Sequence, residues 1–421
     1  MHHFTYRNGR LHCEDVDLST LADEVGTPCY VYSTATLTRH ARVIDEAFKD
    51  VPSLIAYSVK ANGNLGVLAT LANAGCGADV VSGGELQRAL RAGMPAHRIV
   101  FSGVGKTRDE MGLALSAGIH QFNVESAGEL EALSQVATAM NVAAPIALRV
   151  NPDVAAGGHP NISTGKAGDK FGIPWADADD LFGHAARLPG ISVRGVDVHI
   201  GSQIDALGPM RAAFEKTVGL ARRLRERGME IDRIDLGGGL GIPYTADDAP
   251  PPPAAYAEMI RQVIGDLPVQ IILEPGRVIA GNAGVMLTEA LYIKAAPDRT
   301  FLIVDAGMND LMRPALYKAH HEVLPLQEPA ESDKVMRYDI VGPICESTDK
   351  FASEREMAPM KPGDRLAFMS AGAYGAVLSS QYNARSLVAE VLVDGASHAI
   401  VRRRPTFEEM ITIEQVPDWL R

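Results

Sequence analysis

The sequence predicts an α/β protein made of a (β/α)8 barrel and a second, all-β domain. Short apolar or β-branched runs alternate with segments of helical period from about residue 54 to residue 277. After residue 280 the runs are short, β-rich and separated by Gly, Pro, Asp or Asn. Eight strand–helix repeats fit a closed barrel. A doubly wound open sheet is the alternative, but it leaves the polar motifs that follow the strand ends unexplained.

The barrel strands are predicted from eight apolar runs, and helical stripes lie between them. One stripe contains Leu65, Leu68 and Leu71, and another follows Ser126 and Glu129, whose spacing is typical of a capping box. The eight predicted strands are Leu54–Val59, Ala78–Ser82, Arg98–Ser102, Ile119–Val124, Pro145–Val150, Val193–His199, Arg233–Leu236 and Val269–Glu274.

Two connections of the predicted barrel differ from the others. The segment Asn151–Ser192 is much longer than its neighbours and predicts an excursion over the barrel mouth. The proline run Pro250–Pro253 is interpreted as a loop, because the barrel pattern continues on both sides of it.

The second domain is predicted from β-rich runs at both ends of the chain. Its strands are expected at Val285–Ile293, Thr300–Asp305, Arg365–Phe368 and Ala389–Val393, and Cys29–Tyr32 resembles them. We therefore expect a barrel over residues 33–280 and a β domain formed by residues 1–32 and 281–421.

The composition excludes several classes of protein. In 421 residues, 46% are hydrophobic and 22% are charged, which argues against disorder. A net charge of −12 argues against a nucleic-acid partner. The four cysteines have no CxxC spacing, so neither a metal site nor a disulfide framework is expected. With no apolar run long enough to span a membrane and no leader-like N-terminus, we expect a cytoplasmic protein without a membrane partner.

Unusual residues follow several predicted strands at the end where barrels carry their active sites. Lys60 follows the first strand and could act as an amine nucleophile, although a solvated rim lysine is the more common case. His199 ends the sixth strand, where its ring could stack on a planar ligand or simply be hydrogen-bonded at the rim.

A phosphate site is predicted after the seventh and eighth strands. Gly237, Gly238 and Gly239 lack Cβ atoms, so their backbone amides can approach an anion, and Glu274-Pro275-Gly276-Arg277 follows the last strand. Barrel phosphate sites commonly lie in these two loops. A phosphate site, Lys60, a stacking imidazole and the Glu274 carboxylate together are the groups that pyridoxal 5'-phosphate requires.

The chain resembles the diaminopimelate decarboxylase family, which are fold type III pyridoxal-phosphate enzymes with an alanine-racemase-like barrel and a C-terminal β domain. Several of these motifs also occur in ornithine and arginine decarboxylases. One departure is Asn383-Ala384-Arg385-Ser386, where relatives often have Asn-Ser-Arg-Pro. The resemblance runs through Tyr57–Asn62, Val80–Leu86, Phe122–Ser126, Arg149–Pro152, Lys170–Gly172, His199–Gln203, Gly237–Gly239, Glu274–Arg277, Asp305–Asn309, Arg313–Tyr317, Gly342–Ser347, Gly372–Gly375 and Tyr382-Asn383.

This resemblance implies roles for individual residues. It implies catalytic roles for Lys60, His199 and Cys345, with Cys345 as the general acid contributed across a homodimer interface. Cofactor contacts are implied for Lys60, His199, Ser202, Gly238, Gly239, Glu274, Gly276, Arg277 and Tyr374. Substrate contacts are implied for Arg277, Arg313, Tyr317, Glu346 and Tyr374, with the arginines and Tyr317 holding carboxylate and Glu346 the distal ammonium.

The expected reaction is decarboxylation of meso-2,6-diaminopimelate to L-lysine and carbon dioxide, the last step of lysine biosynthesis. A lysine, ornithine or carboxylated-polyamine decarboxylase is the nearest alternative, but such substrates do not require both Arg313 and Glu346. A non-catalytic pyridoxal-phosphate carrier would need neither Cys345 nor Tyr374. An amino-acid racemase usually has a weaker electron sink than Glu274 provides.

Overall fold

The computed structural model describes residues 2–154, 170–330 and 332–421. It divides the chain into two compact units, one formed by Leu37–Ala280 and the other by Met1–Thr36 together with Gly281–Arg421. Across the described residues, no helix is both long and apolar enough to cross a membrane. Both the first and the last described residues belong to this second unit, and the residues of the barrel unit are inserted between its two segments in the sequence.

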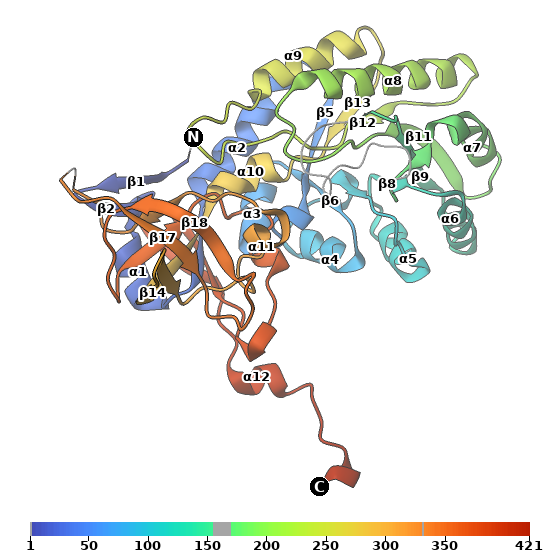
Figure 1. Ribbon diagram of the computed structural model, residues 1–421. Coiled ribbons are helices and arrows are strands. Elements are labelled where there is room, and N and C mark those ends of the chain that lie inside the picture. The colour runs from blue at the N-terminus through green and yellow to red at the C-terminus, as the bar shows by residue number, and fades with distance from the viewer. Residues whose placement is uncertain (1, 155–169, 331) are drawn as a thin grey trace. The chain divides into compact units, whose positions relative to one another are not determined.

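The unit Leu37–Ala280 is a closed parallel barrel with helices on its outside (Figure 1). Among its described residues, eight strands pair in parallel from β5 to β13, and β13 pairs with β5 to close the cylinder. The ends of these strands differ from the predicted ones by two residues or fewer, so the predicted barrel is confirmed. The strands are β5 (Ser53–Ser58), β6 (Gly77–Val80), β7 (Ile99–Phe101), β8 (Gln121–Val124), β9 (Ala144–Asn151), β11 (Ile191–Asp197), β12 (Arg233–Asp235) and β13 (Gln270–Leu273).

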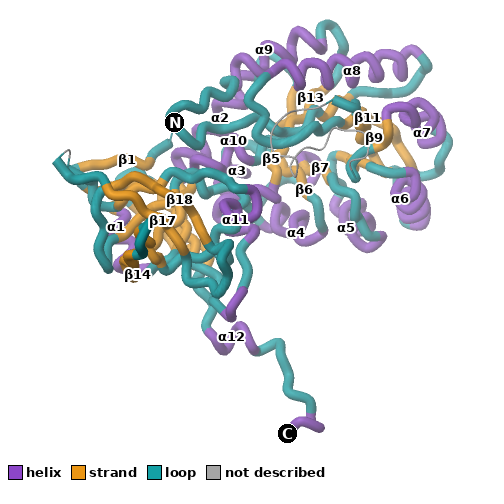
Figure 2. Tube along the Cα trace, in the orientation of Figure 1, coloured by secondary structure: helices purple, strands orange, loops and turns teal. Residues whose placement is uncertain are grey.

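Helices alternate with these strands (Figure 2). Their starts follow from local chemistry: Thr107 and Glu110 form a capping box at α5, and Pro253 occupies the first turn of α9, where its missing N–H costs nothing. The helices are α2 (Thr34–Ala47), α3 (Leu65–Asn73), α4 (Gly83–Arg91), α5 (Arg108–Ala117), α6 (Ala127–Ala139), α7 (Ala178–Ala185), α8 (Leu207–Glu226), α9 (Pro253–Ile264) and α10 (Arg277–Ala280).

The capping box predicted at Ser126 and Glu129 is only half right. The Ser126 hydroxyl accepts a hydrogen bond from the backbone N–H of Glu129 at the start of α6. The Glu129 carboxylate, however, accepts from the N–H of Glu125, one residue before the cap, and from the ammonium of Lys106. The buried lysine competes for the carboxylate and draws it away from the reciprocal contact.

The long connection after β9 contains β10 (Ile173–Pro174), which pairs in parallel with β9, and then α7. Residues 155–169 of the predicted excursion lie outside the described residues. Within the proline run Pro250–Pro253, the first three prolines form the predicted loop, whereas Pro253 is already the first residue of α9.

The second unit is built on a large mixed sheet with the strand order β18-β17-β15-β14-β4-β20-β21. Strand β4, from the N-terminal segment, lies between β14 and β20, so this segment joins the second domain as predicted. Strands β1, β2 and β3 form a small separate sheet, and β19 pairs with both β14 and β16. The strands are β1 (Phe4–Arg7), β2 (Arg10–Cys13), β3 (Val16–Asp17), β4 (Cys29–Ser33), β14 (Gly284–Ala295), β15 (Thr300–Val304), β16 (Val323–Pro325), β17 (Met336–Val341), β18 (Lys350–Met357), β19 (Arg365–Phe368), β20 (Ala389–Asp394) and β21 (Ser397–Arg402).

This unit also carries short helices, which the predicted all-β description omits. Helix α1 (Leu18–Val25) begins where Asp17 accepts from the N–H of Ser19, and it buries Leu18 and Leu21 in the apolar core under the sheet. Helices α11 (Arg313–Tyr317) and α12 (Phe407–Ile411) are one turn each. The sheet nevertheless sets the architecture of the unit.

Candidate active site

Each barrel strand carries a buried polar side chain within its last three residues or directly after its end, and we call the eight side chains named below the polar ring. Asn123 on β8 donates to Asp235 on β12 at 3.0 Å. These two strands are not neighbours in the barrel, so the contact crosses the barrel interior. The polar ring consists of Ser58, Asp79, Ser102, Asn123, Arg149, Asp197, Asp235 and Glu274.

Lys60 lies at the edge of the polar ring, in the single 3-10 turn that follows β5. Its Nζ donates to Oδ2 of Asp79 at 2.8 Å, and the Ser58 hydroxyl donates to the same oxygen at 2.6 Å. The Lys60 side chain is 35% exposed, whereas Asp79 is fully buried. The amine is thus held at the barrel mouth by a buried carboxylate and remains within reach of a ligand.

Glu274 is fixed by two donors from different strands. Its Oε1 accepts from the Ser102 hydroxyl at 3.1 Å and from Nδ2 of Asn123 at 3.2 Å. The Asn123 amide is itself oriented, because its Oδ1 accepts from Nε2 of Gln121 at 2.8 Å. The Glu274 carboxyl group is therefore held in one position inside the barrel.

Crowding of carboxyl groups shifts their protonation. Burial, reinforced by the nearby carboxyls of Asp235 and Asp79, raises the pKa of Glu274 well above its usual range. Burial also raises the pKa of Asp235 to about 7, and burial with the Asp235 charge raises the pKa of Asp197 well above normal. Burial acts the same way on Asp79, but the charge and hydrogen bond of Lys60 outweigh it and leave the pKa of Asp79 lowered. Burial and mutual repulsion therefore favour the protonated form of Glu274, Asp235 and Asp197 more than water would.

His199 is a neutral imidazole in a fixed orientation. Burial, with the positive charges of Arg149 and Lys60, lowers the pKa of His199 well below its usual value. Its Nδ1 accepts from the backbone N–H of Gly238 at 3.2 Å, which leaves the ring proton on Nε2. A neutral ring held in this way presents a flat face at the barrel mouth.

Close packing within the protein, as well as the approach of a ligand, requires glycine residues in the loop after β12. A Cβ on Gly238 would lie 2.2 Å from the carbonyl oxygen of Glu274, and one on Gly239 would lie 2.6 Å from that of Gly201. Gly237 and Gly239 also have positive φ values of 63° and 111°. Glycine alone permits the three loops after β11, β12 and β13 to meet here.

Hydrogen-bond donors converge beside this loop. The Arg277 guanidinium donates to the Ser202 hydroxyl at 3.1 Å and to the Tyr244 hydroxyl at 2.5 Å. Arg277 directly follows Gly276, whose carbonyl accepts from the N–H of Ala280 and so starts α10. A buried arginine beside a hydroxyl and a glycine-rich loop suits a phosphate group.

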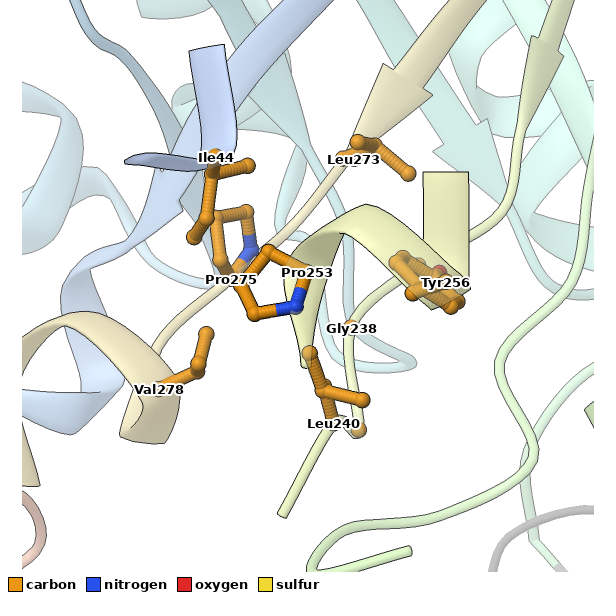
Figure 3. Close-up of a pocket in the computed structure, with 10 residues that line it drawn as sticks. Ile44, Gly238, Leu240, Pro253, Tyr256, Leu273, Pro275 and Val278 are labelled. Atoms are coloured by element: carbon orange, nitrogen blue, oxygen red, sulfur yellow. The ribbon is translucent and has the colours of Figure 1, made fainter. Parts of the chain in front are cut away.

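A small pocket is lined by the glycine loop together with residues of α2, α9, β13 and α10 (Figure 3). Apart from the Tyr256 side chain, its walls are apolar or glycine. Such walls do not suit an anion. The pocket lining consists of Ile44, Gly237, Gly238, Gly239, Leu240, Pro253, Tyr256, Leu273, Pro275 and Val278.

The second unit holds the remaining predicted residues. Arg313 begins α11 and is buried, with one guanidinium nitrogen 2.9 Å from Nε2 of His321, while Tyr317 ends the same turn half-buried. Tyr374 is half-buried with a φ of 56°, a left-handed conformation that is strained for tyrosine and that often marks functional positions.

Cys345 and Glu346 lie on an exposed but well-anchored loop. The Asp349 carboxylate accepts from the backbone N–H groups of Ile344 at 2.7 Å and Met308 at 2.6 Å. The backbone N–H of Cys345 donates to Oδ1 of Asn383 at 2.9 Å. The thiol and the carboxylate are therefore presented outward from a rigid backbone.

Several members of the polar ring escaped the sequence-based site prediction. Asp79, Asn123, Arg149, Asp197 and Asp235 were not among the predicted cofactor contacts, although all are buried. A signal for them was present: each is a polar residue inside a predicted barrel strand, where a buried side chain is expected.

The chain matches a known family model over residues 34–281, described as the pyridoxal binding domain of pyridoxal-dependent decarboxylases. It is 50% identical over 414 residues to a diaminopimelate decarboxylase of Pseudomonas fluorescens, covering 98% of this chain and 99% of that protein. A diaminopimelate decarboxylase of Zymomonas mobilis is 47% identical over 422 residues, 99% of both chains. Among solved structures, the diaminopimelate decarboxylase of M. jannaschii in co-complex with L-lysine is 36% identical, with a TM-score of 0.94 over 99% of both chains. The chain therefore belongs to the diaminopimelate decarboxylase family of pyridoxal-dependent decarboxylases.

Proposed function

We propose that this chain decarboxylates meso-2,6-diaminopimelate to L-lysine and carbon dioxide, as the last step of lysine biosynthesis. Full-length similarity to diaminopimelate decarboxylases, at 50% identity to the Pseudomonas fluorescens protein, carries this proposal. The M. jannaschii relative in complex with L-lysine supports it further. We propose that the barrel of residues 33–280 binds the cofactor, and that residues 1–32 and 281–421 make the contacts to the substrate and to the second subunit of a dimer.

The barrel fits pyridoxal 5'-phosphate on its own chemistry. Oδ1 of Asp197 is buried without a hydrogen-bond partner among the described residues, and a polar ring of this size is costly unless it faces a polar ligand. When bound, pyridoxal phosphate supplies an aldehyde that combines with amines and a ring that accepts the electron pair left by departing carbon dioxide.

The barrel residues would hold this group at both ends. Lys60 would hold the aldehyde through its amine. Glu274, a buried carboxyl group whose pKa is raised, would pair with the basic ring nitrogen, and His199 would offer its flat face. Ser202, Gly238, Gly239, Gly276 and Arg277 would bind the phosphate, and Tyr374 of the second unit would also contact the cofactor.

The second unit would recognise the substrate. The distal end of meso-diaminopimelate carries both a carboxylate and an ammonium, so the protein needs a cation and an anion to bind it. Arg313, Tyr317 and Arg277 would hold carboxylate, Glu346 would hold the ammonium, and Tyr374 would contact the substrate. Cys345 would return a proton to Cα after carbon dioxide leaves, since its thiol is the exposed one of the four.

We further infer a homodimer with a shared active site in the cytoplasm. The exposed loop of Cys345 and Glu346 supports the dimer, because a proton donor that faces outward needs a second surface to form an enclosed site. Exposed apolar side chains near the C-terminus, among them Ile413 at 90% and Trp419 at 83%, also favour association. Free buried thiols at Cys13, Cys29 and Cys76 are typical of a reducing compartment.

The test is carbon dioxide release by the cofactor-loaded protein from meso-diaminopimelate, ornithine, lysine and arginine. We expect meso-diaminopimelate to have the highest kcat/KM, and no D/L interconversion without carbon dioxide release. Lys60→Ala is expected to abolish both turnover and the visible absorbance of the covalently held cofactor, whereas the exposed control Lys49→Ala should change neither. A preference for another amino acid would overturn the substrate assignment. Persistence of absorbance and turnover in Lys60→Ala would overturn the cofactor assignment.

A further inference from the structure

His321 and Arg313 form a buried pair in the sheet-containing unit. Arg313 is 5% exposed and His321 is 2% exposed. One terminal guanidinium nitrogen of Arg313 lies 2.9 Å from Nε2 of His321, and Nδ1 of His321 lies 2.8 Å from the carbonyl oxygen of Met369. The imidazole therefore bridges a side chain and the backbone.

The chemistry of the two contacts fixes the protonation pattern of the ring. The Met369 carbonyl can only accept, so Nδ1 of His321 carries a hydrogen. Arg313 can only donate, so Nε2 must offer a lone pair. A proton on Nε2 would face the guanidinium donor directly, so His321 serves Arg313 as a neutral imidazole with its hydrogen on Nδ1.

The sheet holds this imidazole in place. Strands β16 and β19 pair in antiparallel register, with Val323 opposite Phe368, and the N–H of Met369 donates to the carbonyl of Glu322 at 2.8 Å. His321 and Met369 therefore flank the same pair of strands. The His321 carbonyl also accepts from the Arg355 guanidinium at 3.1 Å.

Arg313, by contrast, stands on a single helical turn. Helix α11 has five residues and is followed by the C-cap residue Lys318, which has a left-handed φ of 53°. A long arginine side chain on so short an element has much rotamer freedom to lose when it binds a carboxylate. The acceptor that His321 supplies beside the sheet removes part of that freedom before any ligand binds.

We propose that His321 is a positioning residue for substrate recognition: it accepts a hydrogen bond from Arg313 and thereby fixes the orientation in which the guanidinium meets the substrate carboxylate. This inference rests on the proposed function. It adds that recognition of the carboxylate depends on a neutral imidazole anchored to the backbone of Met369.

Two substitutions of His321 test its contact with Arg313 separately from its contact with Met369. In His321→Asn the amide can replace Nδ1 and keep the Met369 contact, but it offers nothing where Nε2 lies. In His321→Gln the amide oxygen can reach the position of Nε2 and accept from Arg313. We expect His321→Asn to raise KM for meso-diaminopimelate about tenfold, with kcat within about twofold of wild type. We expect His321→Gln to stay within about threefold of the wild-type KM.

The readouts separate positioning from a general structural role. Visible absorbance of the bound cofactor and the unfolding temperature are measured beside kcat and KM. A His321→Asn variant with lowered unfolding temperature but unchanged KM would overturn the inference, as would equal KM values for the Asn and Gln variants. Should the Asn variant not fold, a tenfold rise of KM in His321→Gln would overturn it, and a near wild-type KM there supports it. Wild-type protein that releases no carbon dioxide from meso-diaminopimelate would overturn the proposed function itself, whereas active wild type with an unaffected Asn variant overturns only this inference.

Discussion

Substitution of Glu129 by Gln should strongly destabilise the barrel, although Glu129 touches no predicted ligand. The ammonium of Lys106 is fully buried and makes three hydrogen bonds of 2.7 Å, to the Glu129 carboxylate and to the carbonyls of Gly103 and Asn123. The other carboxylate oxygen of Glu129 accepts from the N–H of Glu125 at 2.9 Å. The substitution leaves the Lys106 charge buried without a counter-charge, and it puts an amide donor against either Lys106 or the Glu125 N–H.

The magnitude follows from this burial. Breaking a buried ion pair by removing one partner costs about 3–5 kcal/mol of unfolding free energy, because the remaining charge is not solvated. Replacing both members, as in Lys106→Met with Glu129→Leu, should recover most of that loss, since no buried charge remains. The matched control is Glu46→Gln, whose partner Lys49 is exposed, so no measurable change is expected there.

The assay is urea unfolding followed by circular dichroism, at one pH and one cofactor concentration for all variants. We expect the unfolding midpoint to fall sharply for Glu129→Gln, to return toward wild type in the double variant and to stay unchanged for Glu46→Gln. Equal midpoints for Glu129→Gln and Glu46→Gln would refute the reasoning, because burial would then not decide the cost of a lost partner.

Three further predictions concern the site. Gly238→Ala should lower cofactor affinity at least tenfold in a fluorescence titration, because its Cβ would lie 2.2 Å from the carbonyl oxygen of Glu274. The control Gly112→Ala, in half-buried α5 surroundings where a Cβ would lie 3.9 Å from Sδ of Met140, should bind the cofactor like wild type; equal affinities of the two variants would contradict the packing argument. Burial raises the pKa of Asp235 to about 7, so the folded protein binds this proton more tightly than the unfolded chain, and the contribution of Asp235 to stability should fall as pH rises from about 4 to 7. In cofactor-free Asp235→Asn, the urea midpoint should therefore fall less steeply over this pH range than in wild type, and parallel pH dependences would count against the prediction. Cys345 should react first with a thiol reagent, because burial raises the pKa of the other three thiols; a fast phase that survives in Cys345→Ala would disprove this.

Hydrophobic periodicity in the sequence predicted the strands of the barrel better than the strands and helices of the second unit. All eight barrel strands were predicted, because each contains apolar or β-branched residues and helical segments separate it from the next, as expected for strands buried on both faces. In the second unit, β17 and β18 were missed, because charged residues interrupt the apolar residues of Met336–Val341 and Lys350–Met357. Helix α1 was missed as well, since a helix of eight residues between short strands has little periodicity of its own.

The site was predictable where a motif is local and not where partners are distant in sequence. Lys60, His199 and Glu274 stood out beside their strands, but the contacts that tune them come from other strands. Asn123 approaches Glu274 only when the barrel closes, and no spacing along the chain encodes that contact. His321 likewise acquires its significance from Met369, 48 residues further along the chain.

The position of β4 has a consequence for how the protein is made. Its residues pair with β14, at Val31 opposite Val285, and with β20, at Val31 opposite Val391. During synthesis this strand leaves the ribosome first, yet both of its neighbours emerge only after the whole barrel has been translated. The barrel can close while Cys29–Ser33, which is buried in the finished fold, still lacks its neighbouring strands β14 and β20. We therefore expect the nascent chain to expose this edge to chaperones for most of its translation, and the sheet to be completed only when residues 389–394 appear.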